Sequence, residues 1–136
     1  MPIHGDGGHA AVVRELVFTP PGGWIIAVGD NAARKREAQN YTHFAVAIHP
    51  SAVISPSAVI GAGTVVMAGA IIQAHAIVGK HVILNSGCVV DHHVVIEDYA
   101  HIAPGVHLCG GGFVGQGALV GVGACAVPKA SIPAWS

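Results

Sequence analysis

The sequence predicts an all-β solenoid, a parallel β-helix of four to five coils, preceded by a small α/β segment. Three observations lead to this fold class. Residues 51–134 divide into fourteen six-residue blocks without an insertion or deletion. The fourth residue of thirteen blocks is a branched aliphatic residue, and the second residue is always small or β-branched. Glycine or proline recurs at the block boundaries, where the chain must turn.

The six-residue period also predicts which residues face inward. The second and fourth residues of a block point to the same side of an extended chain, so they form the core of the solenoid. Such a period is typical of a β-helix with three faces. The third residue then faces outward, and it is valine or isoleucine in every block from Val53 to Val95. Because exposed apolar faces need a cover, we expect a homo-oligomer.

Composition limits the possible partners. The 136 residues suffice for one domain with a small attachment, and only 10% of them are charged. The chain has no apolar run of the roughly 20 residues that span a membrane, and no signal peptide opens it. The net charge of −1, without a basic cluster, disfavours nucleic acid. The three cysteines follow no disulfide or metal-ligand spacing, which fits a reducing cytoplasm.

The first 48 residues differ in kind from the repeat. A glycine turn, which contains Gly5, Gly7, Gly8 and His9, precedes an expected helix over residues 10–17. A glycine turn that feeds a helix offers free backbone N–H groups to a phosphate. The same residues also fit a plain loop, because the turn lacks the third spaced glycine of a dinucleotide fingerprint.

The rest of this segment predicts a strand, a helix and a second strand. Apolar residues 24–28 follow a proline and glycine cluster and predict a strand. Gly29-Asp30-Asn31 predicts a turn and helix cap, and residues 32–39 predict a polar helix. Residues 42–48 predict a strand that leads into the first coil.

These features together resemble a known family. The unbroken hexads are similar to those of the left-handed β-helix acyltransferases, and the handedness follows from this resemblance alone. The glycine turn, Gly29-Asp30-Asn31 with Arg34, and Ile48-His49-Pro50 resemble the sugar O-acyltransferase group. That group contains sialic acid O-acetyltransferases and acetyl-CoA-dependent N-acetyltransferases of nucleotide-linked amino sugars.

The resemblance implies that the two parts of the chain have different functions. Residues 1–48 are expected to form a reduced, Rossmann-like segment for the nucleotide sugar, held at Gly5, Gly7, Gly8 and His9. Residues 49–136 are expected to form the left-handed β-helix acyltransferase domain. The family habit is a homotrimer. Both the N-terminal segment and the C-terminal coils are shorter than in the family.

The resemblance also assigns catalytic and binding roles. A histidine at the position of His92 is the general base of the family, and His101, nine residues later, is expected to contact acetyl-CoA. Gly121 and Val122 are expected to contact the same co-substrate. The family places an acid directly after the base, where this chain has His93, and Asp91 is expected to orient the His92 ring instead. His75, eighteen residues before His93, is expected to stack beneath it.

The expected protein is therefore a cytoplasmic acetyltransferase that moves an acetyl group from acetyl-CoA to an amino or hydroxyl group of a sugar. Neutral His92 would accept the proton of the attacking group, and no metal is expected. Two alternatives remain open. The short first segment and missing coils fit a non-catalytic β-helix fragment or binding module. The ten histidines also suggest a zinc enzyme similar to γ-type carbonic anhydrases, although their spacing differs from that group.

Overall fold

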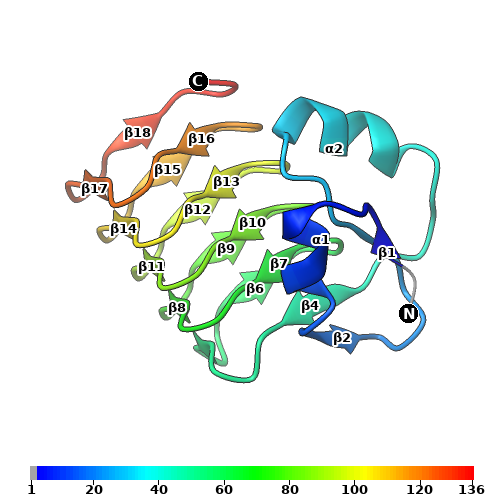
Figure 1. Ribbon diagram of the computed structural model, residues 1–136. Helices are drawn as coiled ribbons and strands as arrows, with labels where there is room; N and C mark the ends of the chain where they lie inside the picture. The colour runs from blue at the N-terminus through cyan, green and yellow to red at the C-terminus, as the bar shows by residue number, and fades with distance from the viewer. Residues whose placement is uncertain (1–2) are drawn as a thin grey trace.

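The computed structural model describes residues 3–136, which form a parallel β-helix with an α/β segment packed against one face (Figure 1). The N-terminal segment contains β1 (Ile3–His4), α1 (Gly8–Val13), β2 (Val17–Thr19), β3 (Ile25–Ile26) and α2 (Asn31–Ala38). Within these described residues, neither helix has the length and apolar character required to cross a membrane.

The solenoid has three faces, and one sheet runs along each of them. The first face contains β4 (Val46–Ile48), β7 (Val65–Val66), β10 (Ile83–Leu84), β13 (His101–Ile102) and β16 (Leu119–Val120). The second contains β5 (Val53–Ile54), β8 (Ile71–Ile72), β11 (Val89–Val90), β14 (His107–Leu108) and β17 (Cys125–Ala126). The third contains β6 (Val59–Ile60), β9 (Ile77–Val78), β12 (Val95–Ile96), β15 (Phe113–Val114) and β18 (Ser131–Ile132).

The register of the sheets confirms the predicted repeat. Each solenoid strand pairs in parallel with the strand one coil away, as when Ile83 lies opposite His101. The second and fourth residues of the blocks form one continuous core along the axis. Burying each aliphatic side chain contributes about 1.5–3 kcal/mol, so this column is the main source of stability.

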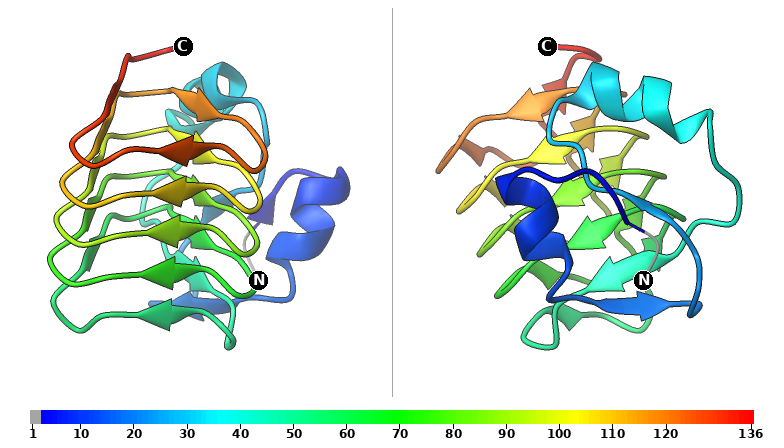
Figure 2. Two further views of the ribbon diagram at one scale, coloured as in Figure 1. Left: turned by 90° about the vertical axis from the view of Figure 1, so that its left-hand side faces the viewer. Right: turned by 45° about the vertical axis from the view of Figure 1, so that its right-hand side comes forward.

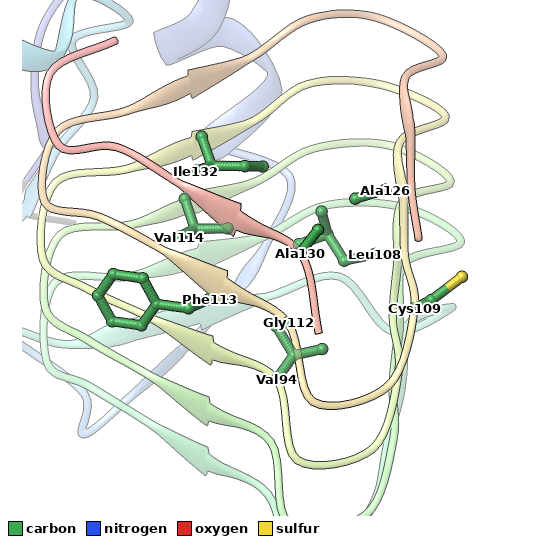
Figure 3. Close-up of a pocket in the computed structure, with 9 residues that line it drawn as sticks. All are labelled: Val94, Leu108, Cys109, Gly112, Phe113, Val114, Ala126, Ala130 and Ile132. Atoms are coloured by element: carbon green, nitrogen blue, oxygen red, sulfur yellow. The ribbon is translucent and has the colours of Figure 1, made fainter. Parts of the chain in front are cut away.

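The core is incomplete inside the last coils. Ala126 is the only fourth-position residue that is not a branched aliphatic, and Gly112 is the only glycine at a second position. Both line a narrow hollow, too small to hold a water molecule, which Figure 3 shows. The rest of its lining consists of Val94, Leu108, Cys109, Phe113, Val114, Ala130 and Ile132.

The N-terminal segment covers the first face (Figure 2). Val65, Met67 and Ile83 on that face are almost fully buried, and they form a second core with Ala10 and Val13 of α1. Val65 and Ile83, which point outward from this face, are therefore covered by their own chain, whereas we expected a neighbouring subunit to cover the outer faces in general; Leu119, farther along the same face, is exposed.

Several outward apolar residues of the other two faces stay exposed. Val53 of the second face is 62% exposed, and Val59 and Ile77 of the third face are 58% and 50% exposed. These are the faces that still need a cover.

The N-terminal elements differ from the prediction in their bounds. The expected helix over residues 10–17 is wrong at both ends, since α1 begins at Gly8 and ends at Val13. Val17, Phe18 and Thr19 instead form β2, which pairs antiparallel with β4. Two β-branched residues around an aromatic residue favour a strand when a sheet edge is available. The expected strand over residues 24–28 is shortened to β3, which pairs with β1.

Candidate active site

The proposed base His92 lies in the turn Asp91–His93, at the corner between the second and third faces. His93 has a φ of 58°, in the left-handed region, which lets the chain change direction here. The Asp91 carboxylate accepts a hydrogen bond from the backbone N–H of His92 at 2.8 Å. This bond stabilises the turn, and the expected role of Asp91 in orienting the imidazole of His92 stays a prediction.

The His92 ring contacts its neighbour His93. The two Nδ1 atoms lie 3.1 Å apart, and the ring planes are nearly perpendicular, at 82°. On its other side the ring lies against Gly110 of the next coil, where an added Cβ would come within 2.5 Å of Nε2. The absence of a side chain at Gly110 therefore keeps the outer nitrogen of His92 open.

The expected stack of His75 beneath His93 is confirmed. The ring centroids lie 5.1 Å apart, and the planes are inclined by 35°. Both residues have a positive φ and occupy the same corner position in successive coils. The corner continues through Gly111 to Lys129, which also have a positive φ.

His101 faces outward from β13 on the covered first face. Its Nε2 lies 3.0 Å from the side-chain nitrogen of Asn85, which can only donate, so Nε2 accepts. Burial, together with the nearby Arg34 guanidinium and His9, lowers the pKa of His101 from 6.5 to about 4. The ring is therefore neutral at physiological pH.

A groove of about 240 Å³ separates His101 from the start of α2. Apolar and polar groups share its wall, and it opens to solvent beside Trp135 and Leu119. Its lining consists of Gly29, Asp30, Asn31, Ala32, His101, Leu119 and Trp135. Sequence reasoning missed Leu119 and Trp135 as site residues. The coil spacing could have placed Leu119, which lies directly opposite His101 in the next strand.

Arg34 holds the two walls of the groove together. It is 1% exposed, and Nε donates to the carbonyl oxygen of His81 at 2.8 Å. Nη1 donates to the Val28 oxygen at 3.0 Å, and Nη2 donates to the Tyr99 oxygen at 2.7 Å. Burial lowers the pKa of Arg34 to about 10, so the guanidinium remains charged. The same side chain thus ties the loop before Asp30 to the coil that precedes His101.

Asn31 adds a second tie between these walls. Its side-chain nitrogen donates to the carbonyl oxygens of Gly117 and Ala118, at 3.0 and 3.3 Å. Its side-chain oxygen accepts from Nη2 of Arg34 at 2.7 Å. The polar residues of the Gly29-Asp30-Asn31 turn therefore position the groove as well as capping α2.

None of the residues of the predicted glycine turn lines this groove, and only His9 lies near it. His9 lies close enough to Arg34 and His101 for their charges to interact, and burial and Arg34 lower the pKa of His9 to about 4. Within the described residues its Nε2 has no hydrogen-bond partner. Gly7 and Gly8 are exposed at the start of α1, and Gly5 packs against Ala27.

Gly121 and Val122, expected to contact the co-substrate, lie in the turn after β16. Both are exposed, and Val122 is 78% accessible. They follow Leu119 of the groove wall by two and three residues. The Gly121 carbonyl oxygen accepts the N–H of Ala124 at 3.1 Å, so the exposed groups that this turn offers to a ligand are the two backbone N–H groups and the Val122 side chain.

One protomer does not bring the predicted residues together. His92 lies at the corner between the second and third faces, and His101 lies on the first face. In a three-sided prism that corner is opposite the first face, so the core lies between the two histidines. A site that uses both must form between protomers.

Across residues 3–136, no group of three or more histidine, cysteine, aspartate or glutamate residues is arranged to hold a metal ion.

Neither a protein-family model nor a curated protein matches the chain, but solved structures do. The acetyltransferase domain of PglB from Neisseria gonorrhoeae is 30% identical, covering 98% of this chain and 84% of that one, with a TM-score of 0.90. It has also been solved in complex with acetyl coenzyme A, with a TM-score of 0.91.

A second similar protein is PerB from Caulobacter crescentus, solved in complex with CoA and GDP-perosamine. It is 35% identical, covering 97% of this chain and 82% of that one, with a TM-score of 0.88. Two further structures of a perosamine N-acetyltransferase from that organism carry one histidine replaced by asparagine or alanine, with CoA and GDP-perosamine bound.

Proposed function

Since the chain belongs to the left-handed β-helix acyltransferases with hexapeptide repeats, we propose that it transfers an acetyl group from acetyl-CoA to a nucleotide-linked sugar. One observation carries this proposal. Structures about 30–35% identical over nearly the whole chain hold acetyl-CoA, or CoA together with GDP-perosamine. Because one of these neighbours is a perosamine N-acetyltransferase, we favour an amino group over a hydroxyl group as the acceptor.

We further propose that the active enzyme is a homotrimer. The exposed apolar residues Val53, Val59 and Ile77 of the second and third faces supply surface for subunit contacts. In such a trimer the corner that carries His92 faces the groove beside His101 of the next protomer. Each active site then takes its base from one chain and its groove from another.

The mechanism that fits this arrangement is direct acyl transfer. His92 accepts a proton at Nε2 while the acceptor nitrogen attacks the thioester carbonyl carbon. The tetrahedral intermediate collapses, the carbon–sulfur bond breaks, and His92 returns the proton to the departing CoA thiolate. A general base of this kind contributes roughly 10²–10⁴-fold. Holding both substrates in one cleft supplies much of the remainder.

The other residues have binding and positioning roles in this proposal. His101, Gly121 and Val122 hold the acetyl-CoA. Gly5, Gly7, Gly8 and His9, together with Asp30 of the groove, receive the nucleotide sugar. Asp91 supports the base by holding the turn through the backbone N–H of His92.

We also propose a cytoplasmic location. Cys88, Cys109 and Cys125 are free thiols. Reduced cysteines are the rule in the cytoplasm, which also supplies acetyl-CoA.

The test is an assay of CoA release with a panel of nucleotide-linked amino sugars and sialic acids. For an accepted substrate, His92→Asn is expected to lower kcat by roughly 10²–10⁴-fold while light scattering shows an unchanged trimer. Wild-type activity in that variant excludes His92 as the base. If the wild-type protein neither turns over nor binds acetyl-CoA at millimolar concentration, the chain is a binding module and the proposal fails.

A further inference from the structure

We propose that His93 is a positioning residue for the base: its Nδ1 accepts the Nδ1–H of His92, so that His92 presents an unprotonated Nε2 to the acceptor. This inference rests on the proposed function, because that function makes His92 the base. It assigns to an imidazole the support that the expectation from sequence gave to Asp91.

The contact between the two rings requires one donor and one acceptor. The Nδ1 atoms lie 3.1 Å apart, and a neutral imidazole carries a single N–H. If His93 donated this bond, the proton of neutral His92 would lie on Nε2, and that atom could not accept another. Only the opposite direction leaves Nε2 of His92 free to act as a base.

The surroundings keep Nε2 open for that task. Gly110 lies against this edge of the ring, and a Cβ there would come within 2.5 Å of Nε2 and 2.6 Å of Cε1. The two ring nitrogens of His92 therefore have different surroundings: Nδ1 contacts His93, and Nε2 lies against Gly110.

The neighbouring charged and titratable groups favour orientation over proton relay. The Asp91 carboxylate is engaged by the backbone N–H of His92 at 2.8 Å. His75 stacks beneath His93 at 5.1 Å, and Lys129 packs above Gly111 in the same corner. In this arrangement His93 acts as an acceptor only: the proton gained at Nε2 stays on His92 until the thiolate takes it, and the Nδ1–H bond to His93 persists throughout.

The turn provides clean variants for a test. His93 and His75 have φ values of 58° and 60°, and Gly111 takes the same corner position with a φ of 70°. Glycine adopts this conformation without strain, so His93→Gly removes the ring and keeps the turn. His75→Gly is the matched control, since it removes the ring beneath without touching His92.

The first measurement is the tautomer of His92, read by long-range ¹H–¹⁵N NMR of the histidine-labelled protein. His49 is an internal reference, because its Nδ1 accepts the N–H of Ser51 at 3.0 Å and its proton must lie on Nε2. His92 is expected to show the opposite tautomer in the wild type and in His75→Gly, and to lose it in His93→Gly. A wild-type His92 with its proton on Nε2 overturns the inference.

The second measurement is the dependence of kcat on pH. His93→Gly is expected to lower kcat by roughly 10- to 100-fold, a loss of the size seen when the partner that orients a metal-bound histidine is removed. KM for acetyl-CoA should stay unchanged. His93→Glu is expected to restore most of kcat and to move the acid limb of the profile to higher pH, because a carboxylate stabilises the imidazolium of His92.

These outcomes separate the inference from the function on which it rests. If His92→Asn is inactive while His93→Gly keeps the wild-type kcat and pH profile, the acetyltransferase function stands and the role of His93 is refuted. If His92→Asn remains fully active, the base assignment itself fails.

Discussion

Two corners of the solenoid carry the same residue in the same conformation and differ in almost everything else. The covered corner, between the third and first faces, contains Gly63, His81, Tyr99, Gly117 and Trp135 in successive coils. The open corner, between the second and third faces, contains His75, His93, Gly111 and Lys129. His81 and His93 have φ values of 54° and 58°, so the repeat gives both the same backbone.

The two corners differ in how far the N-terminal segment buries them. His81 is 4% exposed, lies flat on Tyr99 at 5.2 Å and meets the edge of Phe44 at 4.4 Å. Burial, reinforced by Arg34, lowers its pKa from 6.5 to about 4. His93 is exposed, and its nitrogen meets another ring at the proposed site. The repeat therefore determines where a histidine lies, and the N-terminal segment determines which corner is structural and which is free for chemistry.

The largest expected change is the loss of folding stability on replacing Arg34, which bonds to the covered corner. Arg34→Met leaves the buried carbonyl oxygens of His81, Tyr99 and Val28 without their charged donor. Each unsatisfied buried group costs about 1–3 kcal/mol, so the loss should reach about 3 kcal/mol or more. Urea denaturation should report this loss, and hydrogen exchange should show that the N-terminal segment opens first.

The matched variant at the open corner is Lys129→Met, which removes an exposed cation. It should change the unfolding free energy by less than about 0.5 kcal/mol. Equal losses at the two corners would mean that Arg34 does not anchor the N-terminal segment.

Two glycines offer the next comparison. At the open corner, Gly110→Ala would press only on the end of the His92 ring, so the fold should persist while activity falls by about 10²-fold. At the covered corner, a Cβ on Gly61 would collide with the backbone of Gly79, so Gly61→Ala should destabilise the fold. Thermal melts of both variants measure the expected loss of stability in Gly61→Ala, and CoA-release assays measure the expected loss of activity in Gly110→Ala. Full activity in Gly110→Ala would show that Nε2 of His92 needs no open edge.

The comparison also explains what the sequence could and could not predict. The solenoid strands and the stack of His75 under His93 follow from a local repeat, so a register of eighteen residues was enough to place them. The cover of the first face depends on long-range contacts, such as Arg34 with His81 and Asn31 with Gly117, which leave no periodic trace. The helix expected through Val17 was wrong for the same reason, since β2 forms by pairing with β4.

The site itself was predictable in its positions and less so in its contacts. The spacing placed His92 at a corner, but whether Asp91 would bond the ring or the backbone depended on the turn geometry. The groove was missed because its walls come from α2 and from the last coils. The roles of His92, His101 and Val122 remain proposals, since they involve substrates and neighbouring protomers.

Acid should weaken the contact between the N-terminal segment and the covered side of the solenoid. His9, His81 and His101 each have a pKa lowered to about 4 in the folded chain, against 6.5 for an ordinary histidine. Between pH 6.5 and 4 the unfolded chain therefore binds more protons than the folded chain, and the unfolding free energy falls as the pH falls through this window.

Melting temperatures at pH 7, 6 and 5 measure this loss of stability. His81→Phe keeps a ring for the stack on Tyr99 but cannot titrate, so its melting temperature should depend less steeply on pH. An unchanged slope in that variant would mean that folding does not change the pKa of His81.

The smallest effect concerns the hollow behind the open corner. Ala126 lines it where other coils carry a branched aliphatic residue, and Ala126→Val adds two methyl groups to unfilled space. Each buried methyl contributes up to about 0.8 kcal/mol, and partial exposure at the last strands reduces the gain to about 0.5–1 kcal/mol. The expected result is a melting temperature raised by a few degrees, with unchanged kcat, because the hollow lies inside the solenoid and His92 lies outside it.

Ala118→Val is the control: Ala118 is fully buried in the packed core, and extra volume there should cost about 1–3 kcal/mol. If both variants lost stability alike, the coil behind His92 would be as tightly packed as the rest, and the open corner would differ from the covered one only in its exposure.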